Sequence, residues 1–349
     1  MEDKRKRNLI LNGLLVGAFA LFLFWAQGNL DGYKIQIMNL IAVNIILALS
    51  LNLIYGFAGM FSLGHAGFMA IGAYTCALLI MPPLQKQVLF ILEPAMWPFS
   101  VMHAPFLVAV ILAGLMAALA GILIGLPVLR LGGDYLGIAT LGFAEIIRVL
   151  ANNLPRVTNG ALGFKGIPDY ANIWWNYGWC FITLVIVIRL VNSNYGNALK
   201  AIRDDEVAAR AMGINTFRYR LTAFAIGSFF AGVGGALLGS LLTTIDPKMF
   251  LFLLTFNVLM IVVAGGLGSI TGTIIAGVII TVLLEWLRIV ENPITIGEFY
   301  IPGIPGMRMV VFSLALLFII LFRRQGIMGR KEITWDTVFA LFRKRGVEK

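Results

Sequence analysis

The chain has 349 residues, of which 60% are apolar and only 13% are charged. Soluble domains usually carry about 25% charged residues, so this composition excludes a soluble globular enzyme and a disordered chain. The two cysteines, Cys76 and Cys180, lie in apolar runs and exclude a disulfide scaffold. Because a spanning helix needs about 20 apolar residues, the sequence predicts an all-α, polytopic membrane protein with about ten transmembrane helices.

The formal net charge is +10. Lysine and arginine gather in cytoplasmic loops and beside the anionic inner leaflet, so membrane topology accounts for this excess and no nucleic-acid partner is expected. The basic residues 4–7 lead into the apolar run 8–27, which is longer than the apolar part of a typical secretory signal. Trp25, Ala26 and Gln27 make a poor cleavage site, so we expect this run to be a retained first span.

Ten apolar segments are predicted to cross the membrane. In chain order they are 8–27, 35–55, 62–81, 105–129, 135–153, 172–191, 219–243, 252–268, 272–290 and 307–322. The segments 135–153 and 252–268 are weaker and are candidates for half-helices. The Gly-rich stretch 56–81 predicts a broken or re-entrant start. Eight or nine spans with re-entrant pieces are the alternative to ten.

The distribution of basic residues favours an even number of spans with both termini in the cytoplasm. Most of the 27 Lys and Arg residues then lie inside, including the blocks 189–220 and 323–349. The outer connections 82–105 and 291–306 are rich in proline, which stiffens a loop and ends helices. They are interpreted either as docking loops for an external partner or as ordinary connectors.

Two domains are expected. Residues 1–325 form the transmembrane domain, and residues 326–349 form a cytoplasmic basic tail. Within the tail, the segment 334–345 has apolar residues at helical spacing, which suits a short helix lying on the inner leaflet together with membrane lipid. A disordered tail is the alternative.

The cytoplasmic loop 192–218 is polar but contains many helix-forming residues. It predicts one helix near 198–212, with Asn197 as a cap and Gly213 ending the helix in a left-handed turn. Glu206 and Arg210 are spaced for a favourable i,i+4 ion pair. A slim, alanine-rich helix with a charged flank suits a groove on a partner protein, and a solvated linker helix is the alternative.

A resemblance to a known family rests on this loop. The run from Glu206 through Ala208 and Ala209 to Gly213 resembles the EAA-type loop of ATP-binding-cassette (ABC) importer permeases, although the spacing and the ending differ from the maltose-type motif. The longer string 201–214 resembles the LivM-type permeases of branched-chain amino acid importers. The Gly-rich stretches 51–74, 132–142 and 265–272 are similar to the same family, so the resemblance covers about residues 40–325.

The resemblance implies a permease subunit of the bacterial inner membrane that moves leucine, isoleucine or valine. Relatives of the same layout import urea or short amides, which is the alternative substrate class. The implied partners are a second, LivH-like permease, two LivG/LivF-like ATPase subunits and an external substrate-binding protein; whether the permeases pair as a heterodimer or a homodimer is open. The residues expected to contact the ATPase are Arg203, Asp205, Glu206, Ala208, Ala209 and Gly213.

No cofactor is expected on this chain itself. The stretch from Gly265 to Gly272 lacks the Gly-Lys-Ser/Thr ending of a phosphate-binding loop. ATP and Mg²⁺ are therefore expected to bind only the partner ATPase subunits. No His, Cys or carboxylate cluster has the spacing of a metal site, and no nucleophile–base set is evident, so the chain is not expected to be an enzyme.

Polar and glycine residues at membrane depth predict a translocation path. Broken helices are tolerated in lipid only against protein or a water-filled path, and a charge at the bilayer centre costs about 2.5–3.5 kcal/mol. The candidate path residues are Asn52, Gly59, Ser62, His65, Gly67, Thr140, Glu145 and Asn257. The alternatives are packing for the glycines and for His65, and a structural pair with Arg148 for Glu145.

A different class of transporter is the more distant alternative. An ion-coupled secondary transporter needs intramembrane carboxylates, and only Glu145 is a fair candidate. The two classes differ in whether uptake depends on ATP or on an ion gradient.

Overall fold

The structure is a computed structural model. It describes residues 2–90, 93–130, 135–291, 294–296 and 299–301, followed by 306–307, 310–311, 313–314, 317, 325–329 and 331–333. The longer helices are α1 (Glu2–Asn29), α2 (Gly32–Asn52), α3 (His65–Ile80), α5 (Phe106–Val128), α6 (Tyr135–Asn153), α8 (Ile173–Val191), α9 (Asn194–Asp204), α11 (Thr216–Leu242), α12 (Phe252–Gly265) and α13 (Ile270–Trp286).

Short elements connect these helices. They are α4 (Pro83–Leu89), α7 (Pro155–Thr158), α10 (Glu206–Ala211), a π-helical turn (Leu53–Phe57), 3₁₀ turns (Gly160–Leu162, Pro247–Phe250, Leu287–Glu291) and the strands β1 (Phe164–Lys165), β2 (Thr244–Ile245), β3 (Ile294–Ile296) and β4 (Phe299–Ile301). β1 pairs antiparallel with β2, and β3 pairs antiparallel with β4.

The chain is a polytopic helical membrane protein. Within the described residues, six helices are long and apolar enough to cross a membrane: Ile10–Asn29, Gly32–Phe57, Phe106–Val128, Tyr135–Asn153, Ile173–Val191 and Thr216–Leu242. The pair α3 and α4, bent by 118°, adds up to one more, and α12 and α13 are shorter apolar helices. Each of the first nine predicted segments therefore contains an apolar helix.

The tenth predicted span, 307–322, and the predicted tail helix, 334–345, fall largely or wholly outside the described residues. The total of ten and the cytoplasmic placement of both termini stay predictions. The half-helix interpretation of 135–153 is wrong, because α6 is a continuous helix of 19 residues. By contrast, α12 has only 14 residues, or about 21 Å, which is shorter than a hydrocarbon core of about 30 Å.

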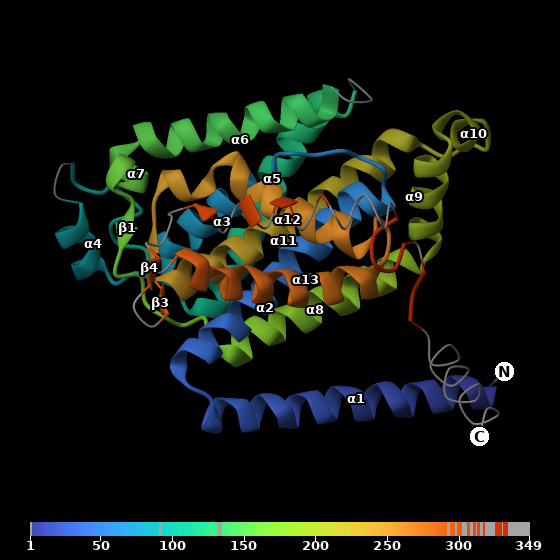
Figure 1. Cartoon of the computed structure of the whole chain (residues 1–349). Helices are drawn as coiled ribbons and strands as arrows, with labels where there is room; N and C mark the ends of the chain where they lie inside the picture. Colours follow the sequence, from blue (N-terminus) through green and yellow to red (C-terminus); the bar gives the residue numbers. More distant parts are fainter. Residues whose placement is uncertain are drawn as a thin grey trace.

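The core forms around α11, which packs against α2, α3 and α5 (Figure 1). Glycines permit this close packing: a Cβ atom at Gly72 of α3 would clash with the backbone of Gly232, and one at Gly235 would clash with the backbone of Met69. Small residues suit such contacts because lipid supplies little hydrophobic driving force between helices.

The predicted broken start of the third span is confirmed. α2 passes into the π-helical turn Leu53–Phe57, residues 58–64 are not helical, and α3 begins at His65. A second break separates α12 from α13, where Gly266 and Gly268 have φ angles of 114° and 83°. Such values favour glycine. Glycines at these positions therefore permit the chain to interrupt the helices.

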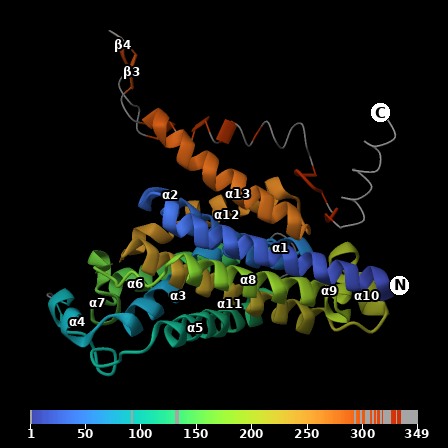
Figure 2. The same cartoon turned by 90° about the horizontal axis from the view of Figure 1, so that it is seen from below.

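The two ends of the bundle differ. The beginning of α1 lies at the same end as α9 and α10, whereas α4, α7 and β1 lie at the opposite end (Figure 1). Figure 2 shows the same separation from a second direction. The helices α9 and α10, together called the arm, therefore lie at the opposite end of the bundle from the proline-rich connection that begins with α4.

Candidate functional site

The predicted cytoplasmic helix 198–212 is two helices rather than one. α9 begins at Asn194 and is capped by Ser193 instead of Asn197. Asp205 is extended, with φ −155° and ψ 109°, and its Oδ1 accepts hydrogen bonds from the backbone N–H groups of Val207 and Ala208 at 2.9 and 3.0 Å. An aspartate side chain that bonds the backbone in this way competes with helix continuation and caps the next helix. The prediction of a single helix is therefore wrong.

The end of α10 was predicted correctly. Gly213 has φ 81°, and its N–H bonds the carbonyl of Arg210 at 2.9 Å, while the N–H of Ile214 bonds the carbonyl of Ala209 at 3.1 Å. This pair of bonds is a Schellman motif, which requires a left-handed residue. Gly213 therefore turns the chain from α10 towards α11.

Glu206 fastens α10 to α11. It forms the expected pair with Arg210, and its Oε2 also lies 2.7 Å from Nη1 of Arg220 on α11. Burial acts to raise the pKa of the Glu206 carboxyl, but the two guanidinium groups outweigh it and hold that pKa below its usual range. The side chain is therefore ionised and paired at neutral pH, and it fixes α10 against the bundle.

Apart from Arg210, the exposed side chains of α10 and of its C-cap Met212 are apolar. Val207 and Met212 are 78% and 83% exposed, and Ala208 is exposed between them. Ala209 is only 4% exposed and faces inwards, so it lies beneath the surface that it was predicted to form. Val207 and Met212 were missed, although two apolar side chains in a polar loop are a readable signal of a contact surface.

Arg203 connects α9 to the broken helix. Its Nη1 donates to the carbonyl of Gly56 at 2.9 Å, and its Nε donates to Asp204 at 3.1 Å. The chain comes so close that a Cβ atom at Gly59, which has φ 68°, would lie 2.8 Å from Cγ of Arg203. A Cβ atom at Gly268, in the break between α12 and α13, would lie 3.0 Å from Nη1 of Arg203. The guanidinium therefore lies against both breaks.

Asn52 joins the same two breaks directly. It is fully buried at the end of α2. Its Oδ1 accepts from the N–H of Gly268 at 2.9 Å, and its Nδ2 donates to the carbonyl of Ser269 at 2.9 Å and to Thr273 Oγ1 at 2.8 Å. One side chain thus replaces backbone bonds that the interrupted helices cannot make.

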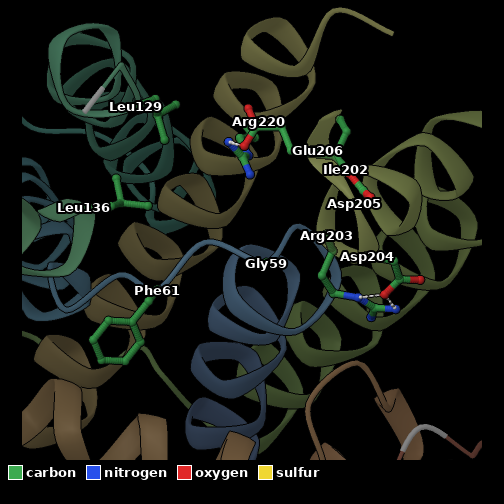
Figure 3. A pocket seen from close by; sticks show the side chains of 10 residues that line it. All are labelled: Gly59, Phe61, Leu129, Leu136, Ile202, Arg203, Asp204, Asp205, Glu206 and Arg220. Atoms are coloured by element: carbon green, nitrogen blue, oxygen red, sulfur yellow. Dashed lines mark hydrogen bonds and ion pairs between the residues drawn. The ribbon is translucent and has the colours of Figure 1, made fainter. Parts of the chain in front are cut away.

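A hollow of about 340 Å³ opens beside Arg203, between the arm and the ends of the spans (Figure 3). Its lining residues are Gly59, Phe61, Leu129, Leu136, Ile202, Arg203, Asp204, Asp205, Glu206 and Arg220. The charged side chains come from α9, α10, α11 and the junction of α9 with α10. The apolar ones come from α9, the loop after α2, the end of α5 and α6. A second hollow of about 400 Å³ includes Lys200, Arg203, Thr271 and Glu332. A movement of the arm would therefore change the space beneath the broken helix.

His65 and Ser62 are buried in the broken segment. Ser50 Oγ donates to the carbonyl of Leu47 at 2.7 Å and lies 2.8 Å from His65 Nε2. The ring of His65 is therefore held against α2 through Ser50. Ser50 was not predicted, because its contact with the ring depends on the bend between α2 and α3.

α6 holds the loop before α3. Thr140 Oγ1 accepts from the N–H of Leu63 at 2.9 Å and donates to the carbonyl of Gly137 at 3.0 Å. A Cβ atom at Gly67 would lie 2.9 Å from Cα of Ala144, which keeps α3 and α6 close. Thr255 of α12, also missed, accepts from the N–H of Ala66 at 2.8 Å and so caps α3.

Six candidate path residues thus surround the break between α2 and α3: Asn52, Gly59, Ser62, His65, Gly67 and Thr140. The other two lie elsewhere. Asn257 is half-buried on α12, and Glu145 is exposed on α6 with Arg148 as its hydrogen-bond partner in the described part of the chain. Among the described residues, no group of three or more His, Cys, Asp or Glu side chains is placed to hold a metal ion.

Comparison with known proteins agrees with this architecture. Residues 33–321 match the family model described as the permease component of branched-chain amino acid transport systems. The LivM high-affinity branched-chain amino acid permease of Escherichia coli is 35% identical over 317 residues, covering 81% of this chain and 69% of that protein.

More distant relatives match as well. A probable LivM permease of Methanocaldococcus jannaschii is 26% identical, with 65% and 69% of the two chains covered. The LivH permease of Salmonella typhimurium is 24% identical, with 89% and 98% covered. No solved structure matches. The match across most of the chain shows that this protein belongs to the family of permease components of branched-chain amino acid transport systems.

Proposed function

We propose that this chain is a multi-pass permease subunit of an ATP-driven importer, which moves leucine, isoleucine or valine across the bacterial inner membrane. The family match and the transport function of the LivM and LivH relatives support this proposal. The apolar spans provide the membrane domain. Hydrolysis of ATP is assigned to two separate ATPase subunits, and capture of the amino acid outside the membrane to a binding protein.

The arm formed by α9 and α10 is the contact with an ATPase subunit. Its exposed apolar side chains, Val207, Ala208 and Met212, suit a hydrophobic groove on that subunit. Asp205 and Gly213 shape the arm, and Glu206 fixes it to α11. A push on α10 is therefore transmitted to a span instead of bending a loose loop.

The hydrogen bond between Arg203 and the carbonyl of Gly56 is the observation that carries the mechanism. It connects the arm to the interruption of α2, and Asn52 connects that interruption to the one between α12 and α13. Movement of the arm would shift both breaks together. Such an element supports two discrete arrangements, biased towards one or the other by the state of the ATPase.

The test is uptake by the complete importer in proteoliposomes. The chain is reconstituted with the second permease, the ATPases and the binding protein, and radiolabelled leucine is offered with ATP at the ATPase side. We expect uptake that requires ATP and continues after ionophores collapse all ion gradients. Uptake that follows an ion gradient without ATP would contradict the proposal, and competition by urea or short amides but not by valine would correct the substrate.

A further inference from the structure

The centre of α6 carries a charged pair on an open face. Glu145 is the eleventh of the 19 residues of α6, and its Oε1 and Oε2 accept from Nε of Arg148 at 2.9 and 3.0 Å. The Glu145 side chain is 52% exposed and that of Arg148 is 24% exposed. Ionised groups at membrane depth are rare and face protein or water instead of lipid. This face of α6 therefore requires a polar or protein cover that the described part of the chain does not supply.

The outward face of α5 has the apolar composition that suits contact with lipid. On α5, the exposed residues are all apolar, among them Leu115, Leu119 and Leu123. α5 and α6 are neighbours in sequence and both are long enough to span the membrane. The exposed face of α5 therefore suits lipid, whereas the exposed face of α6 suits contact with protein.

The open residues of α6 also have the spacing of a helix-packing seam. Ile138, Gly142, Glu145, Val149 and Asn152 are exposed and follow one another at intervals of four and three residues. Such spacing keeps one stripe facing a partner helix. A Cβ atom at Gly142 would meet nothing within 4 Å, so this glycine opens a place where another backbone can approach closely.

Resting on the proposed function, we propose that this stripe of α6 is the surface that binds the second, related permease subunit of the importer. The Gly142 position gives the close contact. The Glu145–Arg148 pair is covered by polar groups of the partner, away from the acyl chains. α5 faces the surrounding lipid.

A photo-cross-linking experiment on the assembled importer tests this surface. p-Benzoylphenylalanine is placed at Ile138 or Val149 of α6, and at Leu115 or Leu123 of α5 as matched exposed controls. After irradiation of membranes, we expect adducts with the tagged second permease from both α6 positions and none from the α5 positions. Adducts from α5 alone, no adduct from α6, or an adduct only between two copies of this chain would overturn the proposal.

A substitution that leaves the single chain undisturbed gives a second measurement. Gly142→Trp fills open space on the isolated subunit, so it should insert normally but lose most of the co-purified second permease. Leu119→Trp on α5 should keep it. Equal co-purification of the second permease with both variants would refute the assignment of this α6 stripe as its binding surface. Because these readouts report contact, they stand apart from the leucine uptake that tests the proposed function.

Discussion

The guanidinium of Arg203 and the carbonyl of Gly56 are 147 residues apart in sequence and 2.9 Å apart in the structure. The bond joins the arm to the place where α2 stops being a regular helix. The Arg203 side chain is only 16% exposed, so solvent competes little for it. This contact connects the end of α9 directly to the interruption of α2.

Replacing Arg203 should uncouple the importer. Arg203→Ala removes the bond to Gly56, and a hydrogen bond from a charged group contributes about 1.5–3 kcal/mol. We expect uptake to fall by about 10- to 100-fold, while the complex assembles and its ATPases still hydrolyse ATP. Leucine uptake and ATP hydrolysis are measured on the same proteoliposomes. A variant whose uptake and hydrolysis both stay normal would remove Arg203 from the mechanism.

Asn52 should matter for stability as well as for transport. Asn52→Ala leaves the part-buried N–H of Gly268 without its partner and removes the bonds to the carbonyl of Ser269 and to Thr273. One unsatisfied group of this kind costs about 1–3 kcal/mol. The matched control is Asn44→Ala, which removes one part-buried bond to Thr281 between the same two helices, α2 and α13. Thermal unfolding in detergent should show a clearly lower midpoint for the Asn52 variant. Equal midpoints would contradict the role of Asn52 as a brace.

The pH dependence of the arm follows from Glu206. Because its folded pKa is lowered, its stabilising contribution is complete above the ordinary glutamate pKa of about 4.3. That contribution is lost as pH falls through the folded value. The backbone amides of residues 206–213 should therefore be less protected from hydrogen exchange, relative to their intrinsic exchange rates, as the pH falls. In the Glu206→Gln variant the same loss of protection should be present already at pH 7. Glu93→Gln, which removes an exposed pair with Arg156, should leave this segment unchanged.

Two neighbouring alanines should respond differently to a charge. Ala208 is exposed, so Ala208→Glu should insert and fold normally but fail to retain the ATPase and lose uptake. Ala209 is buried, so Ala209→Glu should lower the stability of the chain itself, because a buried unpaired charge is costly. Co-purification and thermal unfolding separate the two effects. Normal uptake by the Ala208→Glu variant would contradict the assignment of this face as the ATPase contact.

Much of the fold could be predicted because the spans are long apolar runs. The predicted segment 135–153 coincides with α6, and the predicted 172–191 differs from α8 by one residue. The left-handed turn at Gly213 was predicted because glycine tolerates that backbone at a helix end. Local sequence was sufficient in each of these cases.

The remainder depends on contacts that sequence spacing does not encode. The bonds from Asn52 cross more than 200 positions to Gly268, and the arm is bonded to the backbone of Gly56 through Arg203. Asp205 divides the arm because its side chain bonds nearby N–H groups, which a run of helix-forming residues conceals. The pairing of Glu145 with Arg148 was foreseen as an alternative, but spacing alone does not say which face of α6 is open.

Photo-cross-linking in the assembled importer tests most directly whether an ATPase subunit binds the arm. p-Benzoylphenylalanine is placed at Val207 or Met212 on the arm. The controls are Leu84 and Val88 of α4, which lie at the opposite end of the bundle and are about as exposed as the two arm residues. We predict adducts with an ATPase subunit from the arm positions and none from α4. An arm that forms no ATPase adduct, or an ATPase adduct from α4, would contradict the account.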